Sequence, residues 1–75
     1  MNGQDRIVSD PAVCGGRPIV AGTRMRVADI LSMLAGGASE AEILGDFPYL
    51  TADDVRACLS FAANVVDHRI VKDAA

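Results

Sequence analysis

The sequence holds 75 residues, of which 51% are hydrophobic and 23% charged, with two cysteines and one histidine. This composition predicts a single folded domain without a metal or cofactor, because no CxxC or zinc-type spacing links the cysteines to the histidine. No stretch approaches the roughly 18 apolar residues of a membrane helix, and no signal-peptide core follows the first residues, so we expect a cytoplasmic protein that makes no membrane contact.

The formal net charge of −3 is unevenly distributed along the chain. Residues 1–26 hold four arginines against two aspartates, a net charge of +2, whereas residues 27–75 hold three basic against eight acidic residues, a net charge of −5. An anionic partner is therefore expected to meet the N-terminal third first.

Residues 6–26 predict a short basic β arm, since turn residues divide them into pieces too short for helices. These turn residues are Asp10-Pro11, Gly15-Gly16, Pro18 and Gly22. The β-branched pairs Ile7-Val8 and Ile19-Val20 predict two extended segments in a loose ribbon. We interpret the glycines as turn residues with positive φ, the alternative being phosphate-binding backbone nests beside Arg17 and Arg24.

The first helix is predicted from Val27 by an apolar stripe at helical spacing, formed by Val27, Ile30, Leu31 and Leu34. Gly36-Gly37 provides its C-terminal stop. Arg26, at the N-cap position, is not a capping residue.

Two further helices are predicted from their N-terminal signals. Ser39 and Glu42 have capping-box spacing, and Gly45 with Pro48 ends that helix after about two turns. Thr51 and Asp54 repeat the device at the start of a helix over about residues 52–69. Its predicted buried face comprises Val55, Cys58, Leu59, Ala62, Val65 and Val66.

Together these elements predict a mainly α fold: a three-helix, helix-turn-helix-like (homeodomain-like) core with a short N-terminal β arm. We expect one domain over residues 1–75, with the arm at 6–26 and the helical core at 27–70. The last helix would be the one to enter a DNA major groove. Its first turn carries Asp53 and Asp54, which disfavour contact with phosphates.

Catalysis is not expected from this sequence. The only nucleophile and base available as a pair are Cys14 or Cys58 with His68. Cys58 falls on the apolar stripe of the last helix, and His68 falls near that helix's C-terminus, where a protonated imidazole interacts well with the dipole. Structural roles therefore explain both residues better than an enzymatic one.

The sequence also resembles a known family in an ordered set of short motifs between about residues 6 and 68. These are residues 10–18 (DPAVCGGRP), residues 21–25 (AGTRM), Val27, Leu31, Gly36, Ser39, residues 42–44 (EIL), residues 46–51 (DFPYLT), residues 53–55 (DDV), Ala57 and residues 61–62 (FA). They resemble the domain-of-unknown-function family numbered 433, a group of small antitoxin-like proteins. The resemblance implies a helix-turn-helix-type fold and, for many members, the antitoxin role of a type II toxin–antitoxin pair whose toxin is a PIN-like ribonuclease.

The resulting hypothesis is an antitoxin that neutralises a PIN-like ribonuclease toxin and represses its own operon as a homodimer. Arg17, Arg24 and Arg26 are the candidate toxin-binding residues, because a guanidinium can engage the carboxylates of an acidic active site with two hydrogen bonds. Operator DNA is a second candidate partner, with contacts assigned to Arg17, Arg24 and Arg56. The homodimer is expected to form through unpaired strand edges of the arm. The alternative is a stand-alone helix-turn-helix DNA-binding or protein-interaction module without a toxin.

Overall fold

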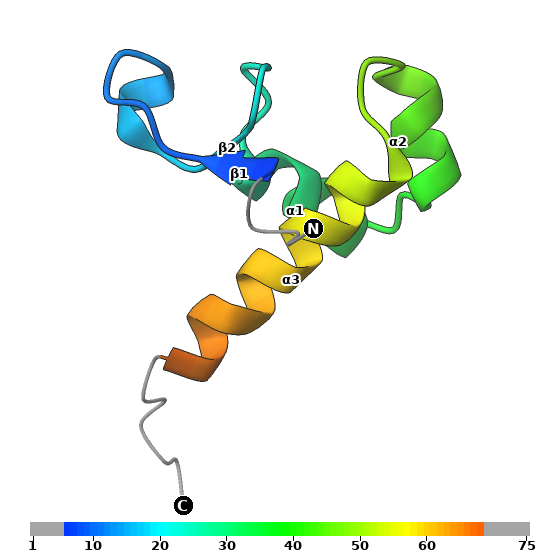
Figure 1. Ribbon diagram of the computed structural model, residues 1–75. Coiled ribbons are helices and arrows are strands. Elements are labelled where there is room, and N and C mark those ends of the chain that lie inside the picture. The colour runs from blue at the N-terminus through cyan, green and yellow to red at the C-terminus, as the bar shows by residue number, and fades with distance from the viewer. Residues whose placement is uncertain (1–5, 69–75) are drawn as a thin grey trace, which may run out of the picture.

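The computed structural model describes residues 6–68, which form three helices and a two-stranded antiparallel sheet (Figure 1). The elements in chain order are β1 (Ile7–Val8), the 3-10 turn η2 (Cys14–Gly16), β2 (Ile19–Val20), α1 (Val27–Ala35), α2 (Glu40–Asp46) and α3 (Ala52–His68). The predicted fold class, a mainly helical domain with a short N-terminal β arm, is confirmed. The short turn η2 was not predicted.

The arm is integrated into the fold rather than loose. Ile7 lies opposite Val20, and Ile19 lies between Val8 on one side and Arg26 on the other. Strand β2 is therefore paired along both edges, and its two side chains are buried. Of the two strands whose edges we expected to pair with a second chain, β2 is thus used on both sides within one chain, whereas β1 pairs with β2 along one edge.

Helix α1 follows its apolar stripe, as predicted. Val27 and Ile30 are buried, while the other two stripe residues are partly buried against the same core. Arg26 precedes the helix in an extended conformation and makes no side-chain cap. The helix ends at Gly36, and Gly37 adopts φ 103°, a conformation that favours glycine.

Both predicted capping boxes are present. The Ser39 backbone N–H donates to Oε1 of Glu42 at 2.8 Å, and the Glu42 N–H donates to Oγ of Ser39 at 3.1 Å. At the start of α3 the Thr51 N–H donates to Oδ2 of Asp54 at 3.0 Å, and the Asp54 N–H donates to Oγ1 of Thr51 at 3.2 Å. Each pair satisfies backbone donors that a helix start leaves free.

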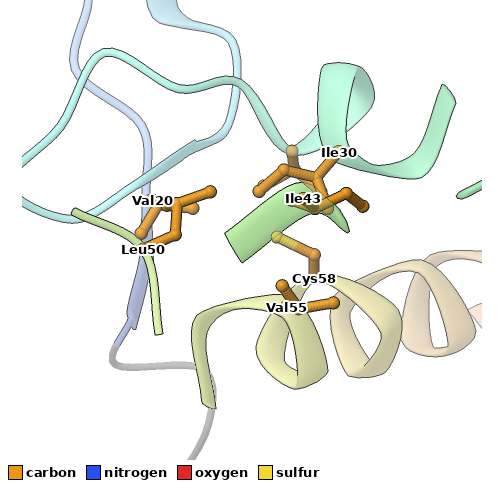
Figure 2. Packing of buried hydrophobic residues seen from close by; sticks show 7 residues of the cluster. Val20, Ile30, Ile43, Leu50, Val55 and Cys58 are labelled. Carbon is orange, nitrogen blue, oxygen red and sulfur yellow. The ribbon is translucent and has the colours of Figure 1, made fainter. Parts of the chain in front are cut away.

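The core lies where the first half of α3 meets the other elements. Figure 2 shows Ile30 from α1 beside Ile43 from α2, with Cys58 and Val55 of α3 across from them. Val20 of β2 and Leu50 pack against each other in the same cluster. The arm therefore shares one core with the helices.

The predicted buried face of α3 is only half correct. Val55 and Cys58 are buried, but Leu59, Val65 and Val66 are exposed by 48%, 40% and 62%. Length accounts for Val65 and Val66: α3 has 17 residues, whereas α1 has nine and α2 seven, so beyond Phe61, which still packs against the core, α3 extends away from the other helices (Figure 1). Leu59 lies before Phe61, so its exposure reflects the side of the helix that it occupies.

Candidate functional site

The Arg24 turn, residues 20–25, is an exposed feature of the arm with a hydrogen-bonded backbone. The Val20 carbonyl accepts hydrogen bonds from the Thr23 backbone N–H at 3.0 Å and from its hydroxyl at 2.7 Å. The same hydroxyl accepts from the Met25 N–H at 3.0 Å, and Gly22 supplies the φ of 78° that closes the turn. Arg24 is thus exposed directly after a turn whose backbone is fixed by the Thr23 side chain.

Arg17 follows a second fixed loop. The Asp10 carboxylate accepts from the Ala12 N–H at 2.9 Å, and the Val13 N–H donates to the Asp10 carbonyl at 2.8 Å. Gly15 and Gly16 have φ of 66° and 82°, which confirms that they serve as turn residues. Arg17 is exposed directly after them. In Figure 1 this loop and the Arg24 turn both project on the side of the molecule away from the free end of α3.

Arg26 lies between β2 and α1 and pairs with the first turn of α1. Its Nε donates to Oδ2 of Asp29 at 3.1 Å, and its Nη2 donates to Oδ1 of the same carboxylate at 3.2 Å. The fork that we expected to bind a toxin carboxylate thus already holds a carboxylate of its own chain. Engaging a partner through Arg26 would require breaking this pair.

Arg6 was not among the predicted site residues, yet it connects the arm to α3. One guanidinium nitrogen donates to Oδ1 of Asp54 at 3.1 Å, and the other lies 3.6 Å from Oδ2 of Asp53. Asp54 is buried, with 7% of its surface exposed. Nothing local in the sequence signals this pair, because its members are 48 residues apart.

Arg56, the predicted DNA contact on α3, lies in an acidic setting. It is 75% exposed and 3.5 Å from Oδ1 of Asp53, one turn earlier. Asp53 and Asp54 occupy the first turn, which is the end of the helix that a groove-reading helix presents to DNA. This charge arrangement opposes insertion of α3 into a groove.

Cys58 has the environment of a core residue rather than of a nucleophile. Burial, and to a lesser extent the Asp54 carboxylate, raises the pKa of its thiol from 9.0 to about 11. A thiol with this pKa is protonated at neutral pH and is not activated for attack. The catalytic alternative that pairs Cys14 with His68 falls on side chains outside the described part of the structure.

The raised pKa of Cys58 predicts a loss of stability at high pH. The thiol ionises from pH 9 in the unfolded chain but only near pH 11 in the folded protein, so unfolding is favoured progressively across that window. The loss should reach up to about 3 kcal/mol. Denaturant titrations below pH 9 and near pH 11 measure it. Cys58→Ala should be less stable throughout but lack this part of the pH dependence; equal pH slopes in the two proteins would contradict the prediction.

Two further properties concern membranes and metals. Within residues 6–68, none of the helices combines the length and apolar character needed to cross a membrane. The same residues bring together no group of three histidine, cysteine or acidic side chains suited to holding a metal ion.

The protein is thus small and mainly helical. Its two-stranded ribbon packs on three helices and carries arginines on exposed turns. The chain belongs to the family described as "Protein of unknown function (DUF433)", whose pattern matches residues 7–62.

Two further proteins are similar to the chain. The uncharacterized protein y4eO of Sinorhizobium fredii (strain NBRC 101917 / NGR234) is 36% identical over 56 residues, which are 75% of this chain and 25% of that protein. The crystal structure of a DUF433 member protein from Anabaena variabilis ATCC 29413 superposes with a TM-score of 0.79 at 31% identity, covering 85% of this chain and 63% of that one. The chain thus spans about a quarter of the curated relative's length and less than two thirds of the crystallised one.

Proposed function

We propose that this protein is an antitoxin that binds and neutralises a PIN-like ribonuclease toxin through the Arg24 turn, and that as a homodimer it also represses its own operon. The observation that carries the proposal is the exposed Arg24 directly after a turn fixed by Thr23. A fixed backbone lowers the entropy lost when the arginine docks into a partner. The antitoxin role itself comes from the family resemblance of the motifs that build this turn.

The chemistry of the turn suits an acidic ribonuclease site. A guanidinium stays charged at cellular pH and can hold a carboxylate with two charge-assisted hydrogen bonds. Arg24, with Arg17 from the neighbouring loop, would occupy the carboxylates that otherwise bind a metal ion and would exclude the RNA phosphate. Such a mechanism needs no catalytic group on the antitoxin, in line with our proposal that the chain is not an enzyme.

The test is binding to the product of the adjacent reading frame, measured by co-purification and then by surface binding kinetics with the antitoxin chain immobilised. Arg24→Ala should weaken binding by at least about tenfold, mainly through faster dissociation, because truncating one member of a desolvated charge pair affects the off-rate. Arg24→Lys should give an intermediate loss, since lysine keeps the charge but not the planar fork.

Arg56→Ala provides the matched control, because it removes an equally charged and exposed residue from α3 rather than from the arm. It should leave the affinity for the toxin within about twofold, as expected for a residue outside the interface core. Unchanged toxin affinity in the Arg17→Ala, Arg24→Ala double variant would overturn the arginine mechanism. Absence of any co-purifying toxin would instead favour the stand-alone DNA-binding or protein-interaction module.

A further inference from the structure

The C-terminal half of α3 carries apolar side chains that no described segment of the chain covers. Leu59 and Val66 are exposed by 48% and 62%, although both lie within a regular helix. In Figure 1 this half of the helix, coloured orange, extends away from the other two helices. Contiguous apolar surface of this kind marks a contact site on a small domain.

These residues form one stripe along the helix. Leu59, Ala62 and Val66 are spaced at i, i+3 and i+7, so their side chains lie on a single face. We call this face the distal stripe. Ala62 lies at its centre, and its small side chain allows a second helix to approach closely.

Two opposite charges flank the distal stripe on the same side. Arg56 and Asp67 are 11 residues apart, which is close to three helical turns, so the two side chains lie nearly above one another. Both are exposed. Arg56 contacts Asp53 at 3.5 Å with both side chains largely exposed, a weak surface pair that leaves the guanidinium able to reorient.

The distal stripe and its two flanking charges are complementary to the same surface on a second copy of α3 that runs in the opposite direction. If a second copy of α3 runs antiparallel with Ala62 near the crossing point, Leu59 lies within one residue of the level of the partner subunit's Val66, and Arg56 lies within one residue of the level of the partner subunit's Asp67. A two-fold axis then produces both ion pairs at once, as an isologous interface requires. The antiparallel arrangement also sets the helix dipoles in opposition, which is the favourable orientation.

We propose that the distal stripe of α3 is the homodimer interface, packed antiparallel against a second copy of this chain and flanked by two Arg56–Asp67 ion pairs. This assignment rests on the dimer of the proposed function and places its interface on α3 rather than on β2, which is already paired on both sides. The Arg24 turn projects on the side away from the free end of α3 (Figure 1), so the dimer leaves it accessible to a toxin.

The test is the mass of the full chain in solution, measured by light scattering and sedimentation across a range of micromolar concentrations. The unchanged protein should reach twice its 7.8 kDa mass. The double variant Leu59→Asp, Val66→Asp should remain monomeric with an unchanged circular dichroism spectrum, because both side chains are exposed in the monomer. Val8→Asp, at an exposed apolar residue of the arm, is the matched control and should still dimerise.

Charge reversal provides the sharper readout. Arg56→Asp and Asp67→Arg should each weaken the dimer by about tenfold, because each places like charges opposite each other twice. The double variant Arg56→Asp, Asp67→Arg should restore the original affinity. A monomeric unchanged protein, a dimer insensitive to the stripe variants, or a failed restoration would each overturn the interface. None of these results affects toxin binding by the Arg24 turn, so the two proposals are tested separately.

Discussion

The substitution Ile30→Ala is expected to lower the free energy of unfolding by about 3 to 5 kcal/mol, the upper part of the range for buried isoleucine and leucine residues. Ile30 is fully buried and lies beside Ile43 at the centre of the core, between α1, α2 and the first half of α3 (Figure 2). A domain of 75 residues is stable by only roughly 4 to 11 kcal/mol. Loss of this one side chain should therefore leave a substantial unfolded population.

Denaturant titration at a fixed protein concentration measures the effect, since dimerisation makes apparent stability depend on concentration. Ile30→Val removes one methylene and should cost only about 0.5 to 1.5 kcal/mol. Leu34→Ala, at a partly buried position of the same helix, should cost clearly less than Ile30→Ala. A loss below about 1 kcal/mol for Ile30→Ala would show that the core repacks around the missing side chain.

The substitution Asp54→Ala should destabilise the protein by roughly 2 to 3 kcal/mol, because one side chain both caps α3 and holds the arm. Oδ2 of Asp54 accepts from the Thr51 backbone N–H, and Oδ1 accepts from Arg6. Alanine removes both acceptors and leaves the Arg6 guanidinium beside a less polar surface. Asp54→Asn keeps an oxygen for the cap but loses the negative charge, so it should cost about half as much.

A double-mutant cycle with Arg6→Ala isolates the link between arm and helix. The coupling energy between Arg6 and Asp54 should be about 1 kcal/mol or more, above the usual value for an exposed ion pair, because Asp54 is buried. The same cycle with Asp53, whose side chain is 61% exposed, is the control and should give a much smaller value. Equal coupling for the two aspartates would contradict the role assigned to Asp54.

The sequence predicted the helices well because their signals are local. Capping boxes at Ser39 and Thr51, and the stop at Gly36, act within one helical turn and depend little on the rest of the fold. Turn glycines with positive φ are equally local. These elements were therefore recognisable from spacing alone.

The features that the sequence could not predict are those that depend on contacts between distant parts of the fold. An apolar stripe predicts burial, but whether Val65 and Val66 are covered depends on how far the neighbouring helices reach. The Arg26–Asp29 pair had a usable signal in its i, i+3 spacing. The Arg6–Asp54 pair had none. As a result, the charge count did not reveal that Arg6 and Arg26 already pair with carboxylates of the same chain.

The Arg6–Asp54 pair also determines when the arm can assemble. Arg6 is synthesised 48 residues before its partner, so the N-terminal ribbon leaves the ribosome long before the carboxylate that anchors it. Contacts of such high sequence separation form late, since the intervening chain must first be ordered. The Arg6 anchor of the arm can therefore form only after the start of α3 has been made, and a chain interrupted before α3 would present the arm arginines without this anchor.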